Sequence, residues 1–139
     1  MSIKVFYDGI GFRQKGIRKL RTLIGKILER EECHPGNINI IITSDDSLIE
    51  INREFLEHDY YTDVITFQYN EGKEINGEVY ISIESVRANA LNYKVSLSTE
   101  MLRVIIHGIL HMAGYDDKTK EEKARMREME NYWIGEFEN

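Results

Sequence analysis

The 139-residue chain has little of what would place it outside the cell or in a membrane. It has a single cysteine, Cys33, so disulfides within the chain are excluded and a reducing cytoplasm is the expected location. No apolar run approaches the roughly 20 residues that span a bilayer, and the start does not have the pattern of a signal peptide. Repeats, low-complexity stretches and Gly/Ser linkers are also absent, which predicts one domain over residues 1–139.

The chain also lacks an excess of positive charge, since its formal net charge is −6. This argues against a protein that coats nucleic acid through bulk electrostatics, and DNA is not expected as a partner. Lysine and arginine residues are nevertheless concentrated in residues 13–31, where an amphipathic helix is predicted. Its solvent face would carry Lys15, Lys19 and Lys26, which are candidates for contact with RNA. The alternative is an ordinary solvated face.

The most informative stretch is a helix and turn over residues 102–117, LRVIIHGILHMAGYDD, in which apolar residues surround two histidines. His107 and His111 are four residues apart, so both rings lie on one helical face and can reach one metal ion. Gly114 allows a left-handed helix end, after which Asp116 or Asp117 can approach the same ion. The alternative is a pair of core histidines satisfied by hydrogen bonds to protein groups.

The donor set favours a catalytic metal over a structural one. A structural zinc is usually closed by four ligands rich in Cys, whereas a catalytic zinc keeps three protein ligands and an open position for water. One Zn²⁺ per chain is therefore predicted, and an oxygen ligand would also accept other divalent metals. Gly108 occupies the position of the general base in HExxH peptidases, which disfavours that chemistry. Because Gly costs about 1 kcal/mol inside a helix relative to Ala, a close approach of ligand or backbone is expected at Gly108.

Residues 107–117, HGILHMAGYDD, resemble the HGxLHLxGYDH signature of the YbeY family of metal-dependent, single-strand-specific endoribonucleases. Residues 52–67 and 77–82 are similar to the family's TDVLSF and GDI segments, in the same order. The resemblance implies that His107, His111 and Asp117 bind the metal, with Asp117 in the place of a third histidine. It also implies single-stranded RNA as substrate, a role in 16S rRNA 3′-end maturation and ribosome quality control, and ribosomal proteins or assembly factors as partners.

Two departures from the family pattern bear on catalysis. Asp117 adds a negative charge, which would weaken the metal as a Lewis acid. Leu56 stands where the family carries an arginine. Arg53 or His58 could approach the cleft instead, and Asp116 could assist the metal-bound water, so these three are candidate catalytic residues. The alternative function is a non-catalytic, ribosome-associated or RNA-binding factor with a structural or vestigial metal site. A weaker third possibility is hydrolysis of a small phosphoester or amide.

The order of elements predicts an α+β domain with a mixed four-stranded sheet, about five helices and a buried central metal-binding helix. Ser98 is expected to cap that helix, and Tyr93 to point inward from the helix before it. A Thr119-x-x-Glu122 capping box should open the last helix. Strands are expected at 3–7, 37–43, 62–67 and 77–83, the last two as an antiparallel pair.

Overall fold

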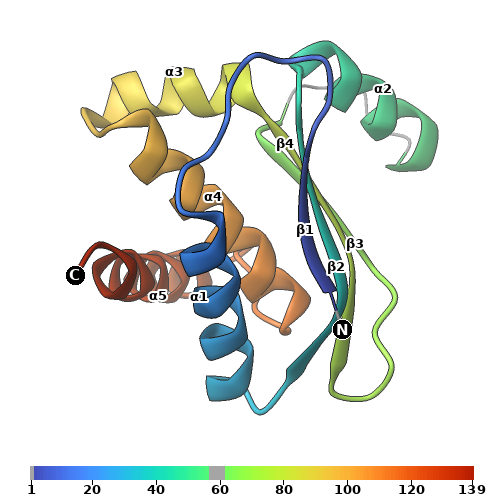
Figure 1. The fold of residues 1–139 in the computed structure, drawn as a ribbon, viewed down its shortest axis with the longest axis vertical. Helices are drawn as coiled ribbons and strands as arrows, with labels where there is room; N and C mark the ends of the chain where they lie inside the picture. Colours follow the sequence, from blue (N-terminus) through green and yellow to red (C-terminus); the bar gives the residue numbers. More distant parts are fainter. Residues whose placement is uncertain (1, 57–61) are drawn as a thin grey trace.

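The computed structural model describes residues 2–56 and 62–139, and its helices and strands form an α+β architecture (Figure 1). The elements are β1 (Ser2–Tyr7), α1 (Ile17–Arg30), β2 (His34–Thr43), α2 (Asp45–Leu56), β3 (Val64–Gln68), β4 (Glu74–Ser82), α3 (Ile83–Tyr93), α4 (Leu97–Met112) and α5 (Lys120–Glu138). The predicted fold class, with a mixed four-stranded sheet and five helices in the described residues, is confirmed. None of the helices in this part of the chain is long and apolar enough to cross a membrane.

The strands lie in the order β1-β2-β4-β3. β2 pairs in parallel with both β1 and β4, while β3 and β4 form the expected antiparallel pair. Alternate residues of β2, Ile38, Ile40 and Ile42, are fully buried because they face the helical layer. This β-branched strand therefore anchors the sheet to the core.

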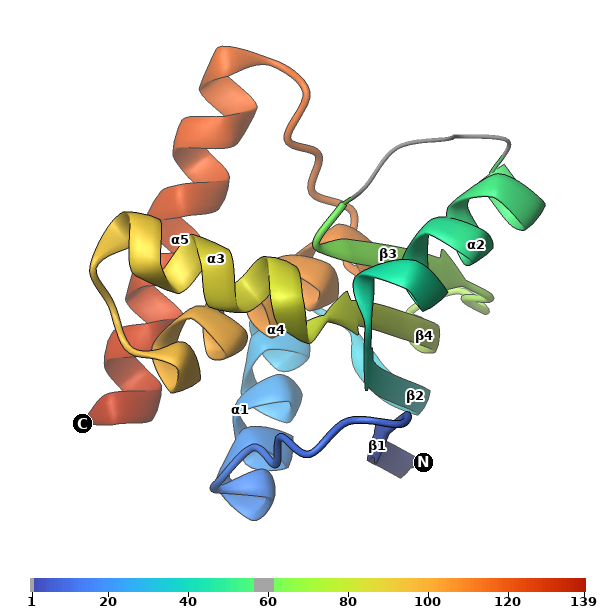
Figure 2. The same cartoon turned by 90° about the horizontal axis from the view of Figure 1, so that it is seen from above.

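Helix α4 is the centre of that core: it packs on β3 and β4, with α1 and α3 as neighbours and α5 also against it (Figures 1 and 2). A Cβ added at Gly108 would lie 2.9 Å from Cγ1 of Val79 on β4. The close approach expected at this glycine therefore exists, and its partner is a side chain of the sheet. Because no larger residue fits there without displacing Val79, Gly108 holds the histidine helix tightly against the sheet.

Three sequence-based details are corrected. α1 begins at Ile17 rather than near residue 13, since Gly16 adopts a left-handed conformation with φ 71°, and Lys15 therefore precedes the helix. The side chain that caps α4 is Ser96, not Ser98, because its hydroxyl accepts a hydrogen bond from the Thr99 backbone N–H at 3.0 Å. The third correction is Tyr93, which is 56% exposed rather than inward-pointing.

The capping box of the last helix is confirmed. The Thr119 hydroxyl accepts from the Glu122 N–H at 3.1 Å, and the Glu122 carboxylate accepts from the Thr119 N–H at 2.8 Å. These two bonds fix where α5 begins, shortly after the turn that follows α4. The turn between the two helices is the segment that carries Asp116 and Asp117.

Candidate metal centre

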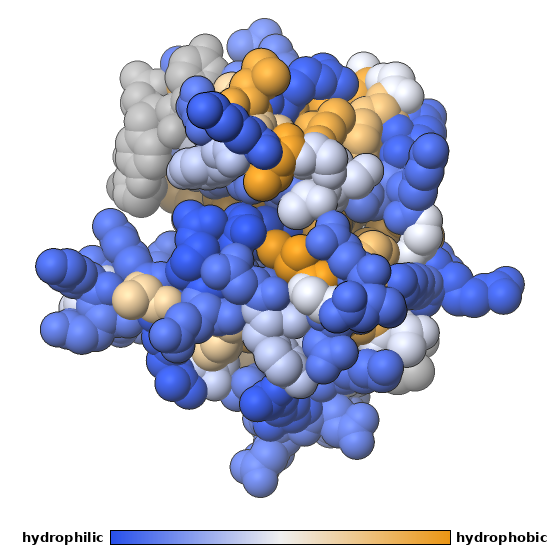
Figure 3. Space-filling model, turned by 90° about the vertical axis from the view of Figure 1, so that its left-hand side faces the viewer, coloured by the Kyte–Doolittle hydropathy of each residue, from blue (hydrophilic) through white to orange (hydrophobic). Residues whose placement is uncertain are grey.

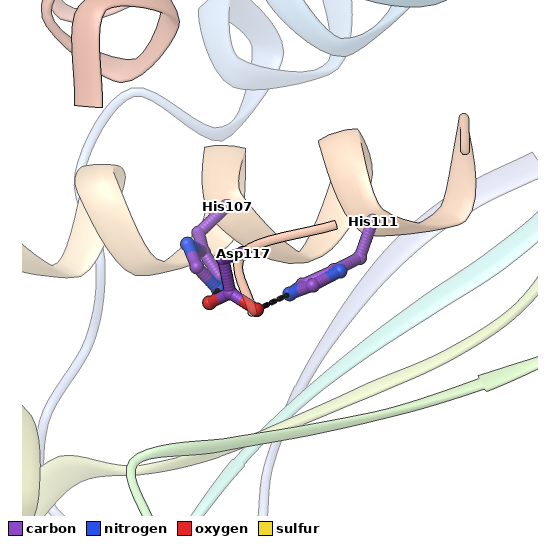
Figure 4. A group of neighbouring side chains, drawn as sticks. All are labelled: His107, His111 and Asp117. Atoms are coloured by element: carbon purple, nitrogen blue, oxygen red, sulfur yellow. Dashed lines mark ion pairs between the residues drawn. The ribbon is translucent and has the colours of Figure 1, made fainter. Parts of the chain in front are cut away.

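Two features of the local structure bring His107, His111 and Asp117 together. α4 places the two imidazoles one turn apart, with ring centroids 4.6 Å from each other. The helix then ends at Met112, and Gly114, with φ 110°, lets the chain reverse along the same face. Figure 4 shows the Asp117 carboxylate between the two rings.

The distances fit a small divalent cation. Asp117 Oδ2 lies 3.2 Å from His107 Nε2, and Asp117 Oδ1 lies 3.4 Å from His111 Nε2. All three residues offer a donor atom within 4.8 Å of the others. Tetrahedral bonds of about 2.0–2.1 Å place neighbouring ligands roughly 3.4 Å apart. Two imidazole nitrogens and one carboxylate are also a donor set that zinc accepts, so these residues could hold such an ion.

Glu130 of α5 fixes the orientation of the first imidazole. Its Oε2 accepts a hydrogen bond from His107 Nδ1 at 2.7 Å, and the residue is only 4% exposed. With Nδ1 engaged by the carboxylate, Nε2 is the nitrogen directed at Asp117. Glu130 Oε1 also accepts from Arg103 Nη1 at 3.3 Å, so the carboxylate is itself held in place.

Sequence reasoning missed Glu130, although the sequence carries a signal for it. The residue lies four positions after Met126 and three before Trp133, both of which are buried on α5. An acidic residue within such an apolar stripe must find a partner inside the protein. The partner could not be identified from sequence, because it belongs to another helix.

The charges around His107 alter its proton affinity. Burial lowers the pKa of His107, but the hydrogen bond and charge of Glu130, together with the charge of Asp117, outweigh burial and raise the pKa above its ordinary value. A cation therefore competes with a proton for this ring more strongly than it would for an unperturbed imidazole.

Two of the three candidate catalytic residues lie in the part of the chain that the structure describes. Asp116 is exposed, and Asp117 is the carboxylate that lies with the two rings in the candidate cluster. Arg53 lies in the last turn of α2 and is not among the described residues that line the hollows beside the histidines. His58 lies outside the described residues.

The predicted basic face of α1 is exposed, but only two of its three candidate lysines lie on the helix and line a common hollow. Lys19 and Lys26 line a hollow between α1 and α5, together with Arg30. Arg30 stacks 4.7 Å from the ring centroid of Tyr132, while Lys19 lies 4.7 Å from that of Phe137. Lys15 is not among the described residues lining this hollow.

The candidate metal centre opens into two adjoining hollows. The smaller, about 250 Å³, lies over the cluster and is walled by the start of β3 and the residues before it, from Thr62 to Thr66. The larger, about 310 Å³, extends from His107 along α4. The site is thus accessible to a ligand larger than water from at least these two directions.

Comparison with known proteins identifies the family. A family model described as endoribonuclease YbeY matches residues 10–138. The chain belongs to the YbeY family. Endoribonuclease YbeY of Phocaeicola vulgatus is 43% identical over 130 residues, which cover 91% of this chain and 94% of that protein. Endoribonuclease YbeY of Amoebophilus asiaticus is 40% identical over 134 residues, which cover 96% of this chain and 91% of that protein.

A solved structure has a similar fold. The solution structure of TM1509 from Thermotoga maritima has a TM-score of 0.67 and 31% sequence identity, and the match covers 98% of this chain and 89% of that chain. The resemblance drawn from residues 107–117 is therefore confirmed over nearly the whole chain. The YbeY relatives named above are endoribonucleases, and this chain has a His-His-Asp cluster that could hold a metal ion.

Proposed function

We propose that this protein is a metal-dependent endoribonuclease that hydrolyses phosphodiester bonds of single-stranded RNA. One divalent ion, zinc by first choice, would be held by His107, His111 and Asp117. The observation that carries the proposal is the convergence of two Nε2 atoms and one carboxylate, 3.2 and 3.4 Å apart, beside open hollows. When bound, a divalent ion supplies Lewis acidity for phosphodiester hydrolysis.

The protein's own residues would prepare the site for that ion. Glu130 keeps His107 in the tautomer whose Nε2 is free to bind, and Arg103 holds Glu130. Asp117 offsets part of the cation's charge, which is expected to moderate its Lewis acidity. Arg53, His58 and Asp116 are proposed as candidates for contact with the substrate or for proton transfer.

Membership of the YbeY family supports a more specific role. We propose 16S rRNA 3′-end maturation and ribosome quality control in the cytoplasm, with ribosomal proteins or assembly factors as partners. Lys15, Lys19 and Lys26 are proposed to contact RNA phosphates away from the metal centre, because each is exposed on or beside α1.

The experiment compares the zinc-loaded protein with His111→Ala and with His34→Ala, a control at an exposed histidine outside the cluster. Each is incubated with a labelled single strand and with a duplex of the same sequence. The wild type and His34→Ala should cleave the single strand and spare the duplex, while His111→Ala should lose at least about 100-fold in rate. Equal cleavage by all three would point to a contaminating nuclease. RNA binding without cleavage would favour the non-catalytic factor with a structural or vestigial metal site.

A further inference from the structure

The larger hollow follows the face of α4 that carries the histidines. Arg103 precedes His107 by four residues and Glu100 precedes Arg103 by three, so all three side chains line the same hollow. α3 and α5 form its walls, and the hollow has a volume of about 310 Å³. Figure 3 shows the molecule from the side where α5 lies, with mainly hydrophilic side chains in its lower part and hydrophobic ones mixed in above them. At roughly 30 Å³ per water this is about ten water volumes, comparable to the roughly ten heavy atoms of one nucleobase.

Glu100 is the buried acceptor of this hollow. It is 3% exposed, and its Oε1 has no hydrogen-bond donor among the residues that the structure describes. Arg103 Nε lies 3.5 Å from that oxygen, close enough for charge attraction but without hydrogen-bond geometry. Because native proteins rarely leave a buried acceptor without a donor, a ligand that brings an N–H group would be favoured here.

The walls formed by α3 and α5 offer surfaces on which a flat ring can stack. The Tyr93 side chain lines the hollow and is 56% exposed, and the Arg127 guanidinium lies 5.7 Å from its ring centroid. Aromatic rings and guanidinium planes are the groups on which proteins stack unpaired bases. Arg103, Lys123 and Arg127 also line the hollow, where they offset most of the negative charge of its carboxylates.

We propose that this hollow binds one nucleobase of an RNA strand at the metal centre, and that Glu100 selects bases carrying an exocyclic amino group. The proposal rests on the proposed function for the path of the strand. Burial raises the pKa of Glu100, and above that pKa the ionised carboxylate only accepts hydrogen bonds, so it pairs with the amino groups of cytosine, adenine and guanine. Uracil has no amino group, and the carbonyl oxygens on either side of its N3–H would be repelled by the carboxylate.

The first measurement is the affinity of the zinc-loaded protein for each of the four nucleoside monophosphates, determined from NMR chemical-shift changes during titration. CMP, AMP and GMP should each bind at least about fivefold more tightly than UMP. Glu100→Gln should reduce this preference to less than about twofold, because an amide can also donate to uracil. Glu128→Gln makes the same charge change at an exposed position of α5 and should keep the wild-type preference.

Tyr93→Ala supplies a second variant at an exposed position, so that the proposal stays testable if Glu100→Gln does not fold. It should lower the affinity for all four monophosphates by about fivefold or more and leave the order of their affinities unchanged. Equal affinity of the wild type for the four bases, an unchanged preference in folded Glu100→Gln, or unchanged affinity in Tyr93→Ala would each overturn the subsite. RNA cleavage is scored separately: base-selective binding without any cleavage would refute the proposed nuclease and leave the subsite standing.

Discussion

Removing the carboxylate behind His107 should weaken metal binding without touching a metal ligand. Glu130→Ala deletes the acceptor 2.7 Å from His107 Nδ1, so the imidazole loses the partner that sets its tautomer and orientation. Glu130→Gln keeps an acceptor but removes the charge. Zinc affinity is therefore expected to be highest in the wild type, lower in Glu130→Gln and lowest in Glu130→Ala.

The size of the effect follows from the burial of this pair. Loss of such an outer partner typically lowers metal affinity by about 10- to 100-fold, which corresponds to roughly 1.4–2.7 kcal/mol. Glu130 is 4% exposed, so solvent does not replace it readily, and the Ala variant should fall toward the upper end. The lost carboxylate also leaves Arg103 with one fewer partner, so some loss of stability is expected as well.

Competition with a chromophoric zinc chelator at fixed pH measures the affinity, and circular dichroism checks that each variant is folded. Glu128→Ala, at an exposed position of the same helix, is the control and should match the wild type. A folded Glu130→Ala protein with wild-type zinc affinity would refute the positioning role of Glu130.

Four further predictions concern the ligands, the fold, pH and the basic face. Asp117→Asn should lower zinc stoichiometry or affinity in the same competition assay, whereas Asp116→Asn should not; the reverse result would exchange their roles. Gly77→Ala should reduce the free energy of unfolding in urea by about 3 kcal/mol or more, because a Cβ there would overlap the Phe67 carbonyl and lie 2.9 Å from Met112 Cε. Gly25→Ala, where a Cβ would have nothing within 4 Å, is the control and should be neutral or stabilising. Equal effects of the two substitutions would contradict the packing described at Gly77. Because the folded-state pKa of His107 is raised, protonated His107 stabilises the metal-free protein fully below about pH 6.5, and this contribution is lost as pH rises through the folded-state pKa. Urea titrations should therefore show falling stability over that range, and zinc should bind more tightly as pH rises. A flat stability profile that His107→Gln leaves unchanged would contradict this. Replacing Lys19 and Lys26 with Gln should weaken RNA binding and flatten its salt dependence, and unchanged binding would leave a solvated face.

The histidine helix could be predicted from sequence because its determinants are local. The four-residue spacing of His107 and His111, the stop at Gly114 and the capping box at Thr119 each act within one turn of backbone. The β-branched run of β2 similarly predicted a central strand. These elements needed no knowledge of the tertiary structure.

The remaining features depend on contacts between elements distant in sequence. Glu130 reaches His107 only because α5 packs on α4, and no spacing rule links the two positions. The cap of α4 is a local exception: the chain leaves α3 through Lys94 in a left-handed conformation, with φ 57°, and α4 begins just after Ser96 rather than after Ser98. Tyr93, expected to point inward, instead lies on the wall of an open hollow, where it is exposed.

The central claim is tested most directly by anomalous X-ray scattering at the zinc edge from crystals of the zinc-loaded protein. The expected result is one anomalous peak within about 2.0–2.2 Å of His107 Nε2, His111 Nε2 and one Asp117 oxygen. A fully loaded crystal with no peak between these three side chains, or with zinc bound only elsewhere, would contradict it.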